Sequence, residues 1–200
     1  MPSALITGAN RRIGLEFARQ YLADGWQVYA ACRDRDSASE LRRLADGSGH
    51  KLKVMALDVT NPLSIKAAAG ELNDQAIDLL LNNAGVMGAR GQTIGNVDYD
   101  AWAKVLDANT MGPMRVSEAF VDHVARSKRK LIVTITSGMG SLADNTSGGS
   151  IAYRSSKAAV NMVMRSLAID SCPSRNYLCG RQSWLGGDRH GGTASHANRD

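Results

Sequence analysis

The chain has 200 residues, a hydrophobic content of 44% and a formal charge of +5 at pH 7. These values suit one globular domain with a sizeable core. No apolar run reaches the roughly 18 residues that span a bilayer, no signal peptide is visible, and three cysteines without regular spacing argue against a disulfide framework. We therefore expect a cytoplasmic protein without a membrane partner.

Strand-like and helix-like segments alternate down to about residue 170. Short apolar runs predict buried strands, and runs with apolar residues at helical spacing predict helices. In chain order, the expected strands cover residues 4–7, 28–32, 52–57, 77–81 and 131–135, and the expected helices cover 13–22, 37–44, 62–73, 98–126 and 151–170. This alternation predicts βαβ units with right-handed crossovers. The fold class is therefore α/β: a Rossmann-like, doubly wound parallel sheet in three layers, truncated after the helix over 151–170.

A glycine-containing turn follows the first expected strand and leads into a helix. It reads Thr7-Gly8-Ala9-Asn10-Arg11-Arg12-Ile13-Gly14. Gly8 permits a tight turn, and the N-terminus of the following helix offers free N–H groups and a positive dipole end to a pyrophosphate. Such a turn can also bind nothing, but its place after the first strand favours a dinucleotide site.

The residue after the second expected strand bears on the choice of nucleotide. An acidic residue there would hydrogen-bond the ribose 2′-hydroxyl of NAD, whereas this chain has Arg33, which suits a 2′-phosphate. Arg11 could reach the same phosphate. We expect NADP(H) in preference to NAD(H), although Asp34 keeps NAD(H) open and both arginines could simply be solvated.

Tyr153 and Lys157 lie four residues apart on an expected helix and so share one face. A lysine ammonium near a phenol favours the phenolate, which brings a tyrosine closer to acid–base work at neutral pH. Ser137, at the end of the fifth expected strand, could hydrogen-bond a substrate carbonyl. Asn109 lies inside an expected helix, where asparagine is unfavourable, so it needs buried partners, such as a water linked to Lys157, or marks a local kink before Pro113.

Two further strand ends carry candidate residues. Asp58 and Val59 follow the third expected strand, and the sequence Asn82-Asn83-Ala84-Gly85 follows the fourth. Ligands of doubly wound sheets lie beyond the carboxyl ends of the strands. These residues could therefore line a nucleotide, or they could simply make turns.

Taken together, these segments resemble the classical short-chain dehydrogenase/reductase family over residues 3–170. Within it, the glycine turn and residues 141–149 are similar to the C-factor and sniffer-type carbonyl reductase group. The resemblance implies hydride transfer between a nicotinamide and a carbonyl or alcohol carbon of a small molecule. It implies a homodimer or homotetramer through helices 98–126 and 151–170. The implied catalytic set is Asn109, Ser137, Tyr153 and Lys157, and the implied cofactor-binding set is Thr7, Gly8, Asn10, Arg11, Ile13, Gly14, Arg33, Asp58, Val59, Asn83, Ala84, Gly85, Tyr153 and Lys157.

The chain departs from the family pattern at two places. The family has glycine where this chain has Arg12, and a side chain there could crowd the pyrophosphate or add a charge contact to it. We expect weaker cofactor binding. From Ser171 to residue 200 the chain shows neither helical nor strand period, and no sixth strand is evident.

The tail of residues 171–200 has two interpretations. With synonymous codons, residues 172–200 can be read one base out of frame as a family-like continuation, which suggests a frameshift near Ser171. Such a truncated chain is expected to be poorly stable and to turn over little substrate. The alternative is a metal site formed by Cys172, Cys179, His190 and His196, but its cysteine spacing is wide for zinc, and we expect no metal.

Two other functions compete with the enzyme. A non-enzymatic nucleotide-binding or C-factor-like signalling protein would keep the cofactor site without turnover. Nucleic-acid binding rests only on the basic run 126–130, which is more simply a solvated helix end, so no nucleic-acid partner is expected. The region that shapes the substrate pocket in the family has no counterpart here, and the substrate is left open.

Overall fold

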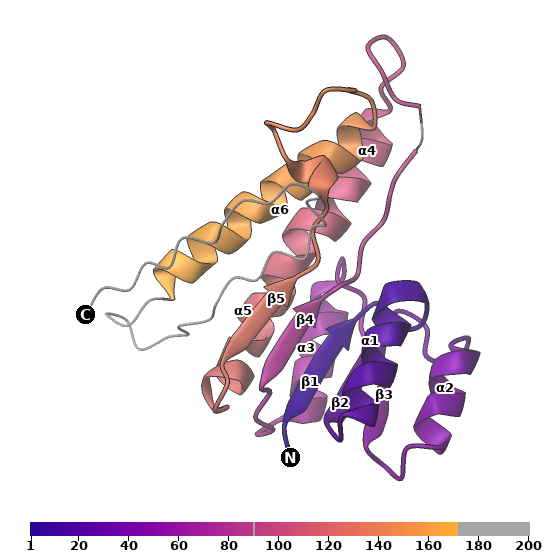
Figure 1. Ribbon diagram of the computed structural model, residues 1–200, viewed down its shortest axis with the longest axis vertical. Coiled ribbons are helices and arrows are strands. Elements are labelled where there is room, and N and C mark those ends of the chain that lie inside the picture. Colours follow the sequence, from indigo (N-terminus) through magenta and orange to yellow (C-terminus); the bar gives the residue numbers. More distant parts are fainter. Residues whose placement is uncertain (90, 172–200) are drawn as a thin grey trace.

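The computed structural model describes residues 1–89 and 91–171, in which strands and helices alternate as expected (Figure 1). The calls on the tail beyond Ser171 lie outside the described residues. The elements are β1 (Ser3–Thr7), α1 (Arg12–Ala23), β2 (Gln27–Cys32), α2 (Ser39–Asp46), β3 (Leu52–Ala56), α3 (Pro62–Leu72), β4 (Leu79–Asn82), α4 (Tyr99–Leu106), a π-helical turn (Asp107–Met111), α5 (Gly112–Ala125), β5 (Leu131–Thr134), a 3-10 turn (Gly138–Gly140) and α6 (Ile151–Asp170).

The five strands form one parallel sheet in the order β3-β2-β1-β4-β5. The predicted Rossmann-like, doubly wound sheet is confirmed. The chain builds outward from β1 in one direction through β2 and β3, then crosses back to β4 and β5. The order therefore reverses between β1 and β4, and a ligand of such a sheet binds beyond the strand ends at this point.

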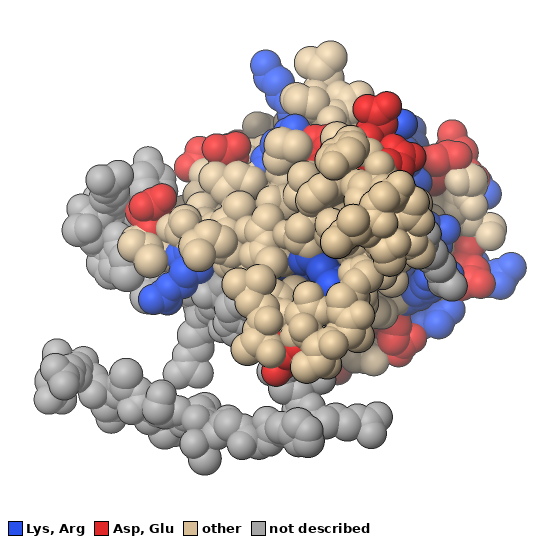
Figure 2. Space-filling view, turned by 90° about the horizontal axis from the view of Figure 1, so that it is seen from above, with Lys and Arg blue, Asp and Glu red and all other residues tan. Residues whose placement is uncertain are grey.

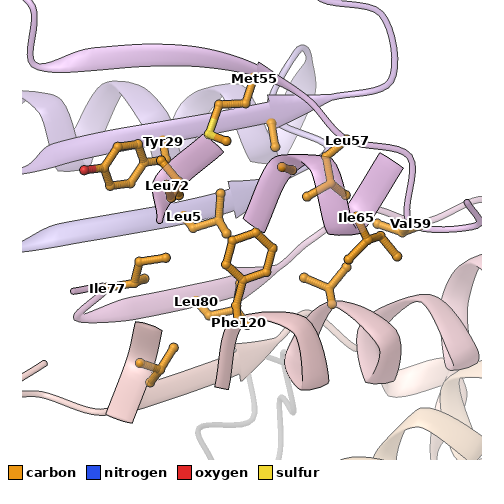
Figure 3. Packing of buried hydrophobic residues seen from close by; sticks show 14 residues of the cluster. Leu5, Tyr29, Met55, Leu57, Val59, Ile65, Leu72, Ile77, Leu80 and Phe120 are labelled. Carbon is orange, nitrogen blue, oxygen red and sulfur yellow. The ribbon is translucent and has the colours of Figure 1, made fainter. Parts of the chain in front are cut away.

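Two apolar layers hold the helices against the sheet. On one face, α3 and α5 pack on the strands through a cluster that includes Leu5, Ile65, Leu80 and Phe120 (Figure 3). On the other face, α1 and α2 pack through a second cluster built around Ile6, with Leu15 and Leu41 from the helices. Because β1 contributes to both clusters, all five of its residues are buried, as expected for the central strand of a doubly wound sheet.

The helix expected over residues 98–126 is interrupted. It is divided into α4 and α5 by the π-helical turn Asp107–Met111, which contains Asn109. A π-turn inserts an extra residue into a helix and is often found at functional sites. The regular helix is therefore interrupted at Asn109, a polar residue that is unfavourable in a helix interior.

Arg12 begins α1 with a φ of +50°, a left-handed conformation in which a side chain costs about 1 kcal/mol. We predict that Arg12→Gly raises the free energy of unfolding by about 1 kcal/mol, measured by urea denaturation. Arg11 is the matched control, because its φ of −161° is extended and Arg11→Gly should bring no gain. Equal effects of the two variants would show that the left-handed backbone is unstrained.

Two arginines of the basic run 126–130 contact other parts of the fold. Arg126 Nη2 donates a hydrogen bond to Asn73 O at 3.0 Å, and the Arg129 guanidinium lies 4.9 Å from the centre of the Trp26 ring. These contacts give two of its cations a structural role. None of the helices within residues 1–89 and 91–171 combines the length and the apolar composition that a membrane span requires.

Candidate functional site

The ends of β1 and β4 are joined by the Thr7 side chain at the point where the strand order reverses. Thr7 Oγ1 accepts hydrogen bonds from the backbone N–H groups of Asn83 and Ala84, both at 3.0 Å. Asn83 Nδ2 donates to Thr7 O at 2.9 Å and to Gly8 O at 3.2 Å. Thr7 and Asn83 therefore shape the site by fixing the two loops against each other.

The glycine turn leaves room at the start of α1. Gly8 has a φ of +65°, and a Cβ atom built on it would lie 2.8 Å from Ala84 Cα. A Cβ atom on Gly14 would lie 2.3 Å from Gly8 O and 2.5 Å from Asn83 Nδ2. Both positions therefore require glycine for this packing of turn, helix and loop.

The N-terminus of α1 has free hydrogen-bond donors. Arg11 occupies the N-cap position, and in this part of the described chain no side chain caps the helix. The first N–H groups of a helix have no partner within it and suit a phosphate. Asn10 lies in this turn, and Ile13 follows on the exposed side of the helix. The turn thus leaves N–H groups at the start of α1 available to an anion such as a pyrophosphate.

Arg33 and Asp34 follow β2, and their side chains differ in availability. Asp34 Oδ1 accepts hydrogen bonds from the N–H groups of Ser37, at 3.2 Å, and Asp36, at 3.0 Å. Hydrogen bonds from Ser37, and then from Asp36, hold the pKa of Asp34 below its usual value. Arg33 is exposed, and no carboxylate of residues 1–89 or 91–171 pairs with it or with Arg11. The arginines are free to meet an anion, while Asp34 is engaged in its own turn.

Asp58 and Val59 lie between β3 and α3. Asp58 Oδ1 accepts hydrogen bonds from Thr60 N at 2.9 Å and Thr60 Oγ1 at 2.7 Å. Val59 is buried against the start of α5, where a Cβ atom on Gly112 would lie 2.9 Å from Val59 Cγ2. The Asp58–Thr60 turn therefore connects the carboxyl end of β3 to the helix that follows Asn109.

Lys157 is the most perturbed titratable group of the site. Its side chain is buried, with 6% of the residue exposed, and Nζ donates a hydrogen bond to Ile135 O at 2.8 Å. Burial disfavours the ammonium and lowers the pKa of Lys157 to about 8. Nζ lies 5.8 Å from the centre of the Tyr153 ring. The helix spacing therefore places amine and phenol ring side by side, as predicted.

Asn109 is 1% exposed, and its amide oxygen and both amide N–H donors make hydrogen bonds. Oδ1 accepts a hydrogen bond from Val86 N at 2.8 Å, while Nδ2 donates to Val86 O at 2.8 Å and to Ser156 Oγ at 3.0 Å. The side chain thus ties the loop after β4 to α6. A relay water linked to Lys157 could donate to the second lone pair of Asn109 Oδ1 or use the backbone at Asn109, because both N–H donors of the amide are already taken.

The loop at Gly85 brings the catalytic candidates together. A Cβ atom on Gly85 would lie 3.1 Å from Asn109 Oδ1 and 3.9 Å from Lys157 Nζ. This close approach places the predicted cofactor loop directly beside two predicted catalytic residues. Gly85, Asn109 and Lys157 are therefore neighbours at the end of β4.

Ser137 precedes the 3-10 turn that packs on α6. Its Oγ accepts a hydrogen bond from Met139 N at 3.2 Å, which leaves the hydroxyl proton free to donate. A Cβ atom on Gly140 would lie 2.8 Å from the backbone carbon of Lys157. Gly140 therefore lets the turn that carries Ser137 approach the helix that carries Tyr153 and Lys157.

Sequence reasoning missed several residues that hold this arrangement. Ser156 Oγ accepts a hydrogen bond from Asn109 Nδ2. Trp102 Nε1 donates to Ser155 Oγ at 2.9 Å, and Thr136 Oγ1 donates to Asn161 Oδ1 at 2.7 Å. Ser155 and Ser156 stand inside the same run as Tyr153 and Lys157, which is the one signal that could have singled them out.

The model of the family described as short chain dehydrogenase matches residues 2–175. The chain belongs to the short-chain dehydrogenase family. Its predicted likeness to the C-factor and sniffer-type group is also confirmed, because both kinds of protein are among its relatives.

Three relatives of this short-chain dehydrogenase differ in sequence identity and in the share of the chain that they cover. The C-signal of Myxococcus xanthus is 41% identical over 109 residues, covering 54% of this chain and 65% of that protein. A short-chain dehydrogenase/reductase from Burkholderia multivorans with bound NADP has a TM-score of 0.78 and 37% identity, covering 84% of this chain and 73% of that one. The carbonyl reductase Sniffer of Caenorhabditis elegans has a TM-score of 0.75 and 32% identity, covering 85% and 80%. The chain thus spans somewhat less than two thirds of the C-signal.

The buried lysine makes the stability of this short-chain dehydrogenase depend on pH. With its pKa lowered from 10.5 to about 8, the folded chain loses this proton before the unfolded chain does. Stability therefore rises with pH between about 8 and 10.5, by about 2 kcal/mol from pH 8 to 10. Urea denaturation at both pH values should show this slope in the wild type and a shallower one in Lys157→Met. Identical slopes would mean that Lys157 is solvated.

Proposed function

We propose that the chain binds NADP(H) and transfers a hydride between its nicotinamide and the carbonyl or alcohol carbon of a small molecule. The observation that carries this is the buried Lys157 Nζ beside the Tyr153 ring, next to the loop at Gly85. A buried amine and a phenol at the switch point of a doubly wound sheet suit proton transfer to a substrate held there.

Each of the four catalytic candidates has a separate role in the proposed reaction. In the reducing direction, a reduced nicotinamide bound here would supply a hydride, with both of its electrons, to the carbonyl carbon. The Tyr153 hydroxyl gives its proton to the carbonyl oxygen, so that the carbonyl becomes an alcohol and the reduced cofactor is oxidised. Ser137 donates a hydrogen bond to the same oxygen, and Lys157 stabilises the phenolate left on Tyr153. Asn109 is a positioning residue, because its amide holds Val86 and Ser156.

NADP(H) rather than NAD(H) is supported by the residues after β2. Arg33 is exposed, whereas the Asp34 carboxylate is held by Ser37 and Asp36. A guanidinium pairs well with a 2′-phosphate. The Burkholderia multivorans relative was solved with bound NADP. The free N–H groups of α1 would hold the pyrophosphate, and Arg11 would add a second cation.

The loops around the site contain few ionisable residues, which supports an uncharged substrate. Residues 83–97 contain one ionisable side chain, at position 90, and residues 135–152 contain only Asp144. Figure 2 views the molecule from the end where α4 lies in Figure 1, and most of that face is uncharged, with Lys, Arg, Asp and Glu gathered mainly around its rim. A neutral aldehyde or ketone is therefore the class of substrate to test.

A second candidate function is a nucleotide-binding signalling protein without turnover. It is favoured by the 41% identity to the C-signal. Both functions use the same nucleotide site, so NADPH binding alone does not separate them. A helix-paired dimer or tetramer through α4, α5 and α6 is compatible with either.

The test uses the purified 200-residue chain. NADPH and NADH binding are titrated by fluorescence, and oxidation of NADPH is followed with neutral aromatic and aliphatic aldehydes, with the alcohol product quantified by chromatography. Tighter binding of NADPH together with one alcohol formed per NADPH consumed supports the enzyme. Binding without product at long incubation supports the signalling function, and failure to bind either nucleotide contradicts both.

A further inference from the structure

The loop 141–150 connects the turn after Ser137 to the helix that carries Tyr153. Most of its residues are exposed, and it enters α6 through three successive left-handed residues, Gly148, Gly149 and Ser150, with φ values of +60°, +65° and +46°. Two glycines in a row leave the backbone free to take other conformations. Contacts from side chains must therefore fix the position of this loop relative to the phenol of Tyr153.

Arg154 supplies that connection. Its Nε donates a hydrogen bond to Gly148 O at 3.1 Å, and its Nη2 donates to Ser147 Oγ at 2.8 Å. Among the described residues, these are the only side-chain hydrogen bonds between α6 and the loop 141–150. A guanidinium holds two acceptors with one planar group, which a lysine cannot reproduce.

The loop behind this contact is internally bonded. Asn145 Oδ1 accepts a hydrogen bond from Gly148 N at 3.1 Å, and Ser141 Oγ accepts one from Asp144 N at 3.2 Å. Hydrogen bonds therefore connect both ends of the loop to its middle. The Arg154 contact at Gly148, called the tie below, thus positions more than one residue of the loop. Because Arg154 directly follows Tyr153 in α6, the same helical turn holds both the reacting hydroxyl and the loop.

We propose that Arg154 is a positioning residue that fixes the loop 141–150 as the substrate-side wall of the site. The proposal rests on the proposed reductase function for its kinetic consequence and on geometry for its structural one. Loss of the tie frees the loop, so that the substrate is bound less tightly and at more orientations. Arg154 does not touch the predicted cofactor residues through any described hydrogen bond, so NADPH binding should not change.

The experiment compares Arg154→Met with Arg165→Met. Arg165 is an exposed arginine of the same helix, and the described residues show no hydrogen bond or ion pair of its side chain. For a neutral aldehyde, Arg154→Met should raise KM about tenfold with kcat changed by less than about twofold. Arg154→Lys and Ser147→Ala, which each remove part of the contact, should raise KM by smaller factors. Arg165→Met should leave KM, kcat and the NADPH dissociation constant at wild-type values.

A second measurement does not need turnover. Hydrogen–deuterium exchange should be faster in peptides covering 141–149 in Arg154→Met than in the wild type, and unchanged in Arg165→Met. Faster exchange in a chain that binds NADPH without turnover would support the tie and reject the reductase function. Unchanged exchange in the loop, or an unchanged KM in an active chain, would overturn the proposal. If Arg154→Met fails to fold, Ser147→Ala carries the same comparison without altering α6.

Discussion

Tyr153→Phe is expected to lower kcat for aldehyde reduction by about a thousandfold, within the range that general acid catalysis contributes. The substitution removes one hydroxyl and keeps the ring that lies 5.8 Å from Lys157 Nζ. The proposed proton donor for the carbonyl oxygen is lost, while the packing of α6 and the glycine turn is retained. Product formed per hour at saturating NADPH is the quantity to measure, since it remains accessible when the wild type is slow.

Tyr99→Phe is the matched control for this prediction. Tyr99 is 72% exposed on α4 and stacks on Trp102, and its hydroxyl has no hydrogen bond among the described residues. Its loss should leave kcat and NADPH binding unchanged. A Tyr153→Phe variant as active as Tyr99→Phe would remove the phenol from the mechanism, whereas loss of NADPH binding in Tyr153→Phe would assign it a binding role instead.

Gly14→Ala should destabilise the fold by about 3 kcal/mol, at the upper end of the cost of overpacking. The new Cβ atom would lie 2.3 Å from Gly8 O and 2.5 Å from Asn83 Nδ2, so α1 must move away from the turn or the loop after β4 must shift. Either movement disturbs the N–H groups proposed to hold the pyrophosphate. Urea denaturation and NADPH titration should both show the loss.

Gly70→Ala provides the opposite result from the same substitution. Gly70 lies within α3, and a Cβ atom on it meets nothing within 4 Å. Alanine there should stabilise the fold by about 0.5–1 kcal/mol and leave NADPH binding unaltered. If both alanine variants lost NADPH affinity, the effect would be a general consequence of altered helices and not of the turn.

The order and type of the elements could be predicted because each depends on local pattern. The apolar run at β1 and the helical spacing after Gly14 are visible in the sequence, and the parallel sheet follows from their alternation. The site at the strand ends follows as well, because the carboxyl ends of parallel strands meet at one edge. The family resemblance, carried by residues far apart in the sequence, is confirmed by the match over residues 2–175.

The parts that could not be predicted depend on contacts across long sequence separations. The π-turn at Asn109 is accompanied by hydrogen bonds to Val86 and Ser156, which are 23 and 47 residues away. Nothing in the local sequence gives these partners, so a continuous helix was the natural expectation. Arg12 departs from the family pattern in the sequence, but its left-handed backbone is visible only in three dimensions. The roles assigned to single site residues remain predictions.

The way α6 is supported has a consequence for how the protein would fail on heating. This helix packs mainly against α4, the π-turn and the 3-10 turn, whereas the glycine turn is anchored to the central strands β1 and β4. The two halves of the site therefore belong to regions that can open separately. If the chain binds NADP(H) as proposed, warming should release α6 before the central sheet, so heat inactivation would pass through a species that still binds the nucleotide but no longer reduces a carbonyl.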